Sequence, residues 1–372
     1  MKIESVESLF IGTQFVVRIR TDTGLSGIGQ TACWGYVDAV DGIVNKFRTY
    51  LVGKDPMRTE YHWQYLYRMG PFRGSALSGA VSAIDIALWD IKGKYFQAPI
   101  WELLGGRCRD KVRLHLLMEG APNLDGLKER ARAAAEEGFT AVKFDPLPLG
   151  YQDMTQARLI SSVRDQVAAV REGAGEDVDV IIEIHRKLSP MVAIALAEHI
   201  SEFRPLFYED PIQIDSVMSQ GEIARRITIP VANGERMHSI WEFRELLSHG
   251  GPQYVRPDVG LAGGLSHCKK IAAIAESYHC AVVTHNFLGP ILTAASVHLD
   301  TSIPNFITQE YSKNDESVEN RIYKTVLKRD GGFISVPEQP GLGVELDEAL
   351  LANAKKESQD LASIPPIRSD GS

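Results

Sequence analysis

Short apolar segments that each end on a glutamate recur through the middle of the chain. The segments are residues 178–183, 205–209 and 229–235, and they end on Glu183, Glu209 and Glu235 at a spacing of 26 residues. Continuous apolar runs of this length are typical of buried strands, and the stretches between them have the periodicity of amphipathic helices. A strand–helix repeat of about 25 residues predicts a closed barrel of parallel strands.

The alternation of strands and helices begins near Lys111. The expected strands are residues 112–117, 140–144, 178–183, 205–209, 229–235, 253–256, 281–284 and 306–309. Helices are expected over residues 125–137, along the face formed by Ile160, Val163, Val167 and Val170, and from near Pro190, Ser216 and Ser239. Gly138 fits the C-terminal end of the first helix. We therefore predict an α/β fold in which residues 111–330 form a TIM barrel.

The N-terminal part has a different pattern. Residues 15–20 and 25–29 alternate like the two strands of a hairpin, and residues 38–51 and 78–95 have helical periodicity. Strands followed by helices predict a separate α+β domain, residues 1–110.

The C-terminal part also departs from the alternation. It contains a strand pattern at residues 333–337 and a short helix pattern at residues 348–354. We expect residues 331–372 to form a segment that packs with the N-terminal domain, or that covers the barrel, and residues 365–372 to be frayed.

Polar residues stand at one phase of the barrel repeat, at the ends of the expected strands. They are Lys143, Glu183, Glu209, Glu235, Asp258, His285 and Glu310. Because the C-terminal ends of barrel strands share one face, these side chains are expected to converge. Three converging carboxylates repel one another unless a cation neutralises them, and oxygen ligands suit Mg²⁺. The pattern therefore predicts a Mg²⁺ site at Glu183, Glu209 and Glu235.

Composition excludes several classes of protein. The chain has 372 residues, 44% of them apolar and 24% charged, with a net charge of -8. A barrel takes roughly 250 residues, so a second unit is expected. The lysines and arginines form no basic patch, no apolar run reaches membrane-spanning length, and the four cysteines have no paired spacing. We expect a cytoplasmic protein that binds neither nucleic acid nor membrane.

Four motifs carry a resemblance to a known family. They are residues 80–94 (AVSAIDIALWDIKGK) with the LLGG at 103–106, the YEDP at 208–211, the NGER at 233–236, and the PD at 257–258 with the GG at 263–264. In these motifs, and over essentially its whole length, the chain resembles the enolase superfamily and its mandelate racemase subgroup, which contains many acid-sugar dehydratases.

The resemblance implies a fold and a metal site. The fold is an α+β capping domain, completed by the C-terminal tail, over a (β/α)7β barrel whose eighth strand lacks its helix. Glu183, Glu209 and Glu235 would bind Mg²⁺, with Asp210 behind them. Relatives often carry aspartate at the first of these positions, so Glu183 is a departure that lengthens the arm by one carbon.

The resemblance also implies catalytic roles. His285 would remove the proton on carbon 2 of the substrate, and Asp258 would orient and tune it. His185 lies two residues beyond Glu183, so in an extended segment it shares the face of that residue. In relatives resembling galactonate dehydratase a histidine here protonates the departing hydroxyl. Glu310 would assist the enediolate intermediate, and its carboxyl could be protonated.

The second strand bears on two sister activities. Racemases and lactonising enzymes of the superfamily carry a Lys-x-Lys pair there, whereas this chain has Lys143, Phe144 and Asp145. Lys143 either contributes positive charge or is simply a lysine at the top of the barrel. We therefore expect a dehydratase that converts an aldonate into a 2-keto-3-deoxy sugar acid.

Two alternatives remain open. The first is a racemase or epimerase of 2-hydroxy acids that uses His285 on one face and Lys143 or His185 on the other. The second is a non-catalytic, metal-dependent sugar-acid binder, which would not need both histidines. The substrate contacts are expected from the capping domain, at Trp34, Tyr36 and Arg73, and the protein is expected to be a homo-oligomer with a small-molecule partner.

Overall fold

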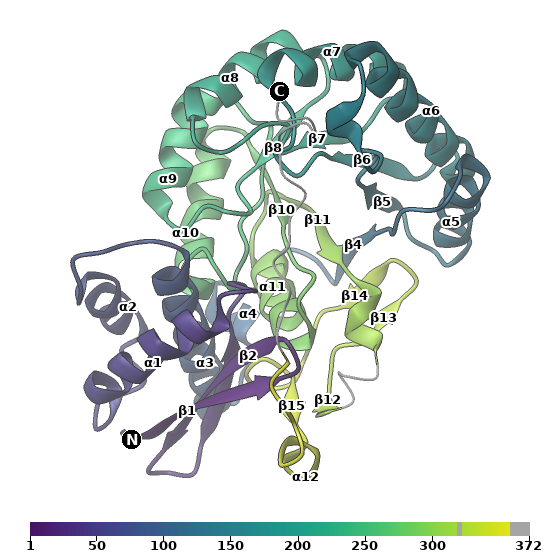
Figure 1. The fold of residues 1–372 in the computed structure, drawn as a ribbon. Coiled ribbons are helices and arrows are strands. Elements are labelled where there is room, and N and C mark those ends of the chain that lie inside the picture. Colours follow the sequence, from purple (N-terminus) through teal and green to yellow (C-terminus); the bar gives the residue numbers. More distant parts are fainter. Residues whose placement is uncertain (318–321, 358–372) are drawn as a thin grey trace.

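A closed barrel of eight parallel strands forms the centre of the molecule (Figure 1). The computed structural model describes residues 1–317 and 322–357. The barrel strands are β4 (Lys111–Leu117), β5 (Ala141–Phe144), β6 (Asp179–Glu183), β7 (Phe207–Glu209), β8 (Val231–Asn233), β9 (Tyr254–Val255), β10 (Ala281–Thr284) and β11 (Phe306–Tyr311). Each pairs with its neighbour in parallel, and β11 pairs with β4 to close the ring. The predicted α/β barrel is confirmed.

Helices surround this barrel on the outside (Figure 1). They are α5 (Leu124–Glu136), α6 (Gln156–Ala174), α7 (Pro190–Ile200), α8 (Val217–Arg226), α9 (Ile240–Glu245), α10 (Gly264–Ser277) and α11 (Pro290–Ser302). The expected apolar face of α6 is buried, and Ser216 and Ser239 cap α8 and α9 by accepting backbone N–H bonds. Among the described residues, no helix is long and apolar enough to cross a lipid bilayer.

The N-terminal residues form an antiparallel sheet covered by helices. The sheet contains β1 (Ile3–Ile11), β2 (Gln14–Thr21) and β3 (Ser26–Gln30), and the helices are α1 (Val37–Leu51), α2 (Thr59–Arg68), α3 (Ser75–Phe96) and α4 (Ile100–Leu103). The expected hairpin is β2–β3. Gly29 lets α3 approach β3 closely, because a Cβ atom there would lie 2.0 Å from the Ala83 carbonyl oxygen.

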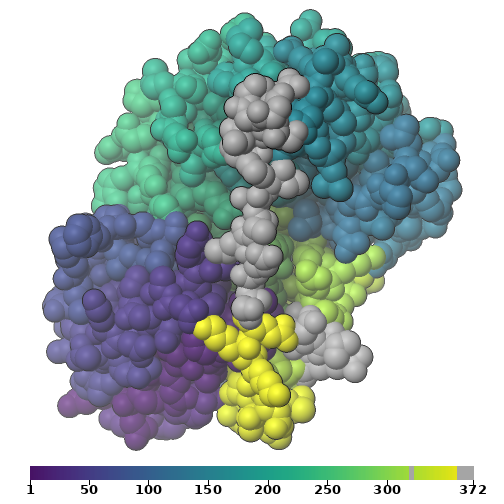
Figure 2. Space-filling view, viewed as in Figure 1, coloured from purple at the N-terminus to yellow at the C-terminus, as the bar shows by residue number. Residues whose placement is uncertain are grey.

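Helix α3 also joins the N-terminal part to the barrel. Asp85 accepts hydrogen bonds from the backbone N–H and the hydroxyl of Ser266 on α10, at 3.0 and 2.6 Å. The Trp63 indole donates to the Gly263 carbonyl at 2.8 Å. A Cβ atom on Gly264 would lie 2.3 Å from Asp85 Oδ2, which explains a glycine at this position of the GG motif. Figure 2 shows the purple N-terminal residues directly against the green part of the barrel.

The chain after the barrel contacts both parts. β11 is followed by η4 (Lys313–Glu316), β12 (Tyr323–Thr325), β13 (Arg329–Asp330), β14 (Phe333–Ser335), β15 (Glu345–Leu346) and α12 (Glu348–Leu351). β14 pairs antiparallel with β4 and so extends the barrel sheet. Glu348 pairs with Arg18 of the N-terminal sheet at 2.7 Å. The end of the tail, expected to be frayed, lies outside the described residues.

Candidate active site

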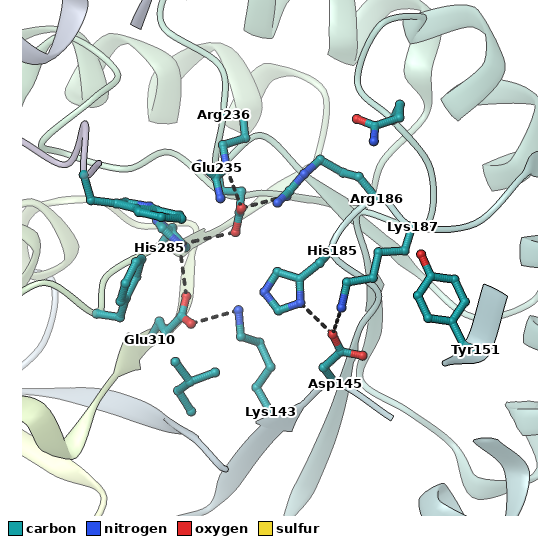
Figure 3. Close-up of a pocket in the computed structure, with 14 residues that line it drawn as sticks. Lys143, Asp145, Tyr151, His185, Arg186, Lys187, Glu235, Arg236, His285 and Glu310 are labelled. Atoms are coloured by element: carbon teal, nitrogen blue, oxygen red, sulfur yellow. Dashed lines mark hydrogen bonds and ion pairs between the residues drawn. The ribbon is translucent and has the colours of Figure 1, made fainter. Parts of the chain in front are cut away.

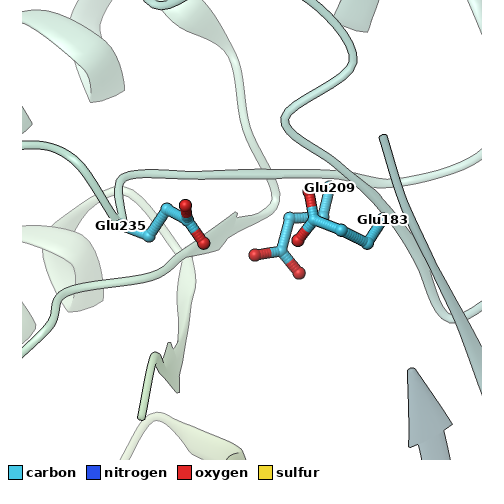
Figure 4. A group of neighbouring side chains, drawn as sticks. All are labelled: Glu183, Glu209 and Glu235. Carbon is cyan, nitrogen blue, oxygen red and sulfur yellow. The ribbon is translucent and has the colours of Figure 1, made fainter. Parts of the chain in front are cut away.

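The three predicted glutamates lie together at the C-terminal ends of the barrel strands (Figure 4). Glu183 ends β6, Glu209 ends β7, and Glu235 lies two residues beyond β8. One carboxylate oxygen from each lies within 4.8 Å of the others, and all three side chains are buried. Three buried oxygen donors at this separation fit a hard divalent cation such as Mg²⁺.

Lys143 neutralises part of this negative charge. Its Nζ atom lies 3.1 Å from Glu183 Oε2, 3.2 Å from Glu209 Oε2 and 2.8 Å from Glu310 Oε1. Burial and Arg256 lower the pKa of Lys143, but the three carboxylates outweigh them, so this pKa is raised above its ordinary value. Lys143 is therefore a buried ammonium group that holds carboxylates in place.

Two arginines neutralise a further part of the negative charge of these acids. Arg256 is fully buried and forms ion pairs with Glu209 and Glu310. Arg186 Nη1 lies 2.7 Å from both Asp210 Oδ2 and Glu235 Oε1. Burial nevertheless raises the pKa of Glu209 well above its ordinary value despite Arg256. The cluster can thus accept more positive charge, as a bound divalent cation would provide.

His285 and Asp258 form the expected dyad. His285 Nδ1 lies 2.7 Å from Asp258 Oδ2, and the other oxygen of Asp258 accepts the backbone N–H of Gly260 at 2.7 Å. His285 Nε2 lies 3.3 Å from Glu235 Oε2. Burial lowers the pKa of His285, but Glu235, Glu310 and Asp258 outweigh burial and raise it. The ring is oriented through Nδ1 and presents Nε2 to the carboxylate cluster.

Glu310 is held as an ionised carboxylate. Burial raises its pKa, but Lys143 and Arg256 reverse this effect and bring the pKa to about 2. The protonated form considered from the sequence is therefore disfavoured. The nearer His285 nitrogen, Nε2, lies 3.9 Å from Glu310 Oε2, so this carboxylate also faces the dyad.

His185 reaches the same cavity by a different backbone path from the extended one we expected. β6 ends at Glu183, and both His185 and Arg186 have left-handed backbone angles, with φ of 51° and 65°. The imidazole Nδ1 lies 2.9 Å from Asp145 Oδ2, and Lys187 Nζ lies 2.6 Å from the same oxygen.

A cavity of about 610 Å³ connects these groups (Figure 3). Its wall is formed by Trp34, Leu117, Lys143, Asp145, Tyr151, His185, Arg186, Lys187, Gln213, Glu235, Arg236, His285, Phe287 and Glu310. Of the expected substrate contacts, only Trp34 lies on this wall. Tyr36 lines a smaller cavity of about 240 Å³ next to Trp34. Arg73 lies elsewhere, where its guanidinium donates to the carbonyls of Gly70 and Phe72.

Several residues of the site were not identified from the sequence. Asp145 and Arg256 lie two positions after Lys143 and two before Asp258, so strand alternation would have placed them on the same face. No comparable signal marks Arg186, because its position depends on the left-handed turn.

The chain matches both the N-terminal and the C-terminal domain of one protein family. Residues 126–350 match the family described as enolase C-terminal domain-like, and residues 5–105 match the N-terminal domain of mandelate racemase and muconate lactonizing enzyme. Two proteins named D-galactonate dehydratase, from Verminephrobacter eiseniae and Ralstonia pickettii, are each 35% identical to this chain. The alignments cover 100% of this chain and 99% of the first relative, and 96% and 94% for the second.

Solved structures agree with these matches. An enolase from Agrobacterium radiobacter, with bound sodium and L-malate, has a TM-score of 0.93 at 28% identity. The match covers 100% of this chain and 99% of the chain of that enolase. A Salmonella enterica serovar Typhimurium protein provisionally named a dehydratase has a TM-score of 0.90 at 33% identity, covering 95% and 98%.

Proposed function

Because this chain belongs to the enolase superfamily and to its mandelate racemase subgroup, we propose that it is a Mg²⁺-dependent acid-sugar dehydratase. It removes water from carbons 2 and 3 of an aldonate and yields a 2-keto-3-deoxy sugar acid. The observation that carries the proposal is that His185 and His285 line one cavity together with Glu235 of the carboxylate cluster. Dehydration needs a base and an acid at neighbouring carbons, and two histidines at one cavity supply both.

Glu183, Glu209 and Glu235 are the proposed Mg²⁺ ligands. When bound, the cation supplies positive charge for the substrate carboxylate and for the negative charge that develops on it. Lys143 and Arg256 keep the ring of carboxylates compact, since each bridges Glu209 to Glu310. These contacts preorganise the ligands.

His285 is the proposed base. Asp258 accepts Nδ1–H, so Nε2 is the nitrogen that takes the proton from carbon 2. The ring then becomes positively charged, and the carboxylates of Glu235 and Glu310 near Nε2 favour that form. Glu310 therefore acts through charge, as an ionised group.

His185 is the proposed acid. It donates a proton to the hydroxyl on carbon 3 as the bond between that carbon and oxygen breaks, and water leaves. The electron pair from the carbon 2–hydrogen bond becomes the new double bond, and the resulting enol rearranges to the keto acid. Two histidines on different loops allow the two proton transfers to occur at neighbouring carbons.

The racemase alternative is weaker on this geometry. Lys143 is a poor second base, because carboxylates surround its ammonium group and raise its pKa. A racemase or epimerase would therefore depend on His185 to return a proton at carbon 2. The 2-hydroxy acid malate bound to the Agrobacterium relative is compatible with either reaction.

D-galactonate is the first substrate to test, since whole-length relatives carry that name. We expect the purified protein with Mg²⁺ to release a 2-keto-3-deoxy acid from one or a few members of a panel of aldonates and aldarates, detected by reaction of the keto group with semicarbazide. If no member yields a keto acid, the proposed function is wrong. Formation of an epimer in its place would support the alternative.

A further inference from the structure

We propose that Asp145 is a positioning residue for His185, so that the acid side of the reaction has an aspartate–histidine pair of its own. This inference rests on the proposed function, since it assigns a partner to the proposed acid. Asp145 lies directly after β5, whereas His185 follows the neighbouring strand β6, and both line the cavity.

The carboxylate of Asp145 is itself fixed on both oxygens. Oδ2 accepts His185 Nδ1–H at 2.9 Å and the Lys187 ammonium at 2.6 Å, while Oδ1 accepts the backbone N–H of Leu147 at 2.9 Å. Three donors leave this carboxylate little freedom to rotate. The Asp145 side chain is therefore a rigid support for the imidazole ring.

The backbone of His185 is held as firmly as its ring. Two successive left-handed residues that are not glycine are strained, and such strain persists only where contacts determine it. Here the His185 N–H donates to Glu183 Oε1 at 2.7 Å, and the Arg186 N–H donates to the Asp210 carbonyl at 2.7 Å. The turn places the His185 ring within hydrogen-bond distance of Asp145, which follows β5.

In the His185 ring, Nδ1 is hydrogen-bonded to Asp145 and Nε2 faces the cavity (Figure 3). Because Nδ1 is bonded to Asp145, Nε2 remains for the substrate, and Figure 3 shows it turned toward the middle of the cavity. The arrangement repeats that of His285, whose Nδ1 is bonded to Asp258 at 2.7 Å. The two pairs approach the cavity from different sides, as the two proton transfers require.

Asp145 would act only through His185. In the step concerned, the proton on His185 Nε2 moves to the oxygen leaving carbon 3, the carbon–oxygen bond breaks with its electron pair on oxygen, and water is released. The Asp145 carboxylate keeps its own bonds throughout. Its removal should leave proton abstraction at carbon 2 intact and slow only the departure of the hydroxyl.

The test compares two leaving groups in Asp145→Ala. On the aldonate that the wild-type protein dehydrates, we expect kcat to fall at least about 100-fold with KM changed less than about 3-fold, since general acid catalysis is typically worth this much or more. On the 3-deoxy-3-fluoro analogue, fluoride leaves without a proton. There the variant should eliminate at close to the wild-type rate, which a general loss of structure would not allow.

Two further variants make the result unambiguous. Asp145→Asn keeps the volume and an acceptor for the Leu147 N–H, and should show the same contrast between the two substrates to a smaller degree. Asp179→Ala is the matched control, since it removes an aspartate at the opposite end of β6 whose ion pair with Arg113 is 2.7 Å long. It should dehydrate at the wild-type rate.

The outcomes separate this inference from the function it rests on. Dehydration by Asp145→Ala at the wild-type rate would overturn the inference, and so would equal slowing of both substrates by a folded Asp145→Asn protein. Absence of keto acid and of carbon 2 proton exchange in the wild-type protein would instead overturn the proposed function.

Discussion

Asp258 is a buried carboxylate whose role depends on a single hydrogen bond. It accepts His285 Nδ1–H at 2.7 Å, which in the proposed mechanism leaves Nε2 as the nitrogen that meets the substrate. An asparagine in its place could still accept the Gly260 N–H, so the loop would keep its shape. The amide could not stabilise the positively charged ring that forms when the proton is taken.

We therefore expect Asp258→Asn to lower kcat by about 10²- to 10⁴-fold with little change in thermal stability. Asp179→Asn is the control, because it makes the same change at the opposite end of the barrel strands, where Asp179 pairs with Arg113 at 2.7 Å. Steady-state kinetics and thermal unfolding measure the two effects. A wild-type rate for Asp258→Asn would exclude the dyad from the mechanism.

The residues of the site differ in how far the sequence predicts them. The three clustered glutamates and His285 could be predicted because each lies at or just beyond the end of a strand at a regular spacing, and strand ends share one face. His185 could be predicted to reach the cavity, but its path could not, since left-handed angles at two residues that are not glycine have no sequence signal. Arg186 was missed for the same reason.

Among the secondary-structure elements, α3 has the largest effect on how the two parts of the chain meet. It is 22 residues long and buried along most of its length, between the N-terminal sheet and α10. Asp85 lies inside this contact with Ser266. Burial raises the pKa of Asp85 to about 7, although the Ser266 bonds lower it.

A pH dependence of stability follows from this raised pKa. The unfolded chain binds the Asp85 proton only below about pH 4, whereas the folded protein keeps it up to about pH 7. The folded state therefore binds more protons between these values, and the contribution of Asp85 to stability falls as the pH rises from about 4 to 7. Well above pH 7, Asp85 is ionised in both states and its contribution to stability no longer changes with pH.

We expect Asp85→Asn to be more stable relative to wild type at pH 7.5 than at pH 4.5, because the amide has no proton to lose. Urea unfolding at the two pH values measures this difference. Asp41→Asn, which replaces an acid on α1 away from this contact, should show no such change. An equal stability difference at both pH values would mean that Asp85 is ionised throughout.

Most elements could be predicted from the sequence, though not their limits. The fifth barrel strand was expected to reach Glu235 but ends at Asn233, because Gly234 turns the chain with φ of 129°. Helix α2 was missed, although Thr59, His62, Trp63 and Leu66 are buried at helical spacing. Its aromatic and polar composition hides that pattern.

At the scale of the whole molecule, the cavity needs both parts of the chain. Trp34 comes from the N-terminal part and stands 6.3 Å from Phe287 of the barrel, ring centre to ring centre. Arg236 lies beside both Trp34 and Glu235. A substrate held by the carboxylate cluster would therefore touch a surface that includes Trp34, from the loop between β3 and α1.

Metal binding should increase the free energy of unfolding of the whole molecule. Three buried carboxylates within 4.8 Å repel one another, so Mg²⁺ should favour the folded state. At Mg²⁺ concentrations of 100 times Kd, this effect amounts to about 2.7 kcal/mol. We expect Mg²⁺ to raise the Tm of the wild-type protein and of Glu242→Gln, but not that of Glu209→Gln. Equal shifts for all three proteins would place the ion elsewhere.

The two histidines provide the most direct test of the central claim, that this cavity dehydrates an acid sugar with separate groups for the two proton transfers. The measurement is proton NMR in D₂O, with Mg²⁺, of the aldonate that the wild-type protein dehydrates. Separate samples contain the wild-type, the His285→Asn or the His185→Asn protein. We predict keto acid from the wild type, neither reaction from His285→Asn, and exchange of the carbon 2 proton without keto acid from His185→Asn. Normal dehydration by His185→Asn, or exchange by His285→Asn alone, would contradict the account.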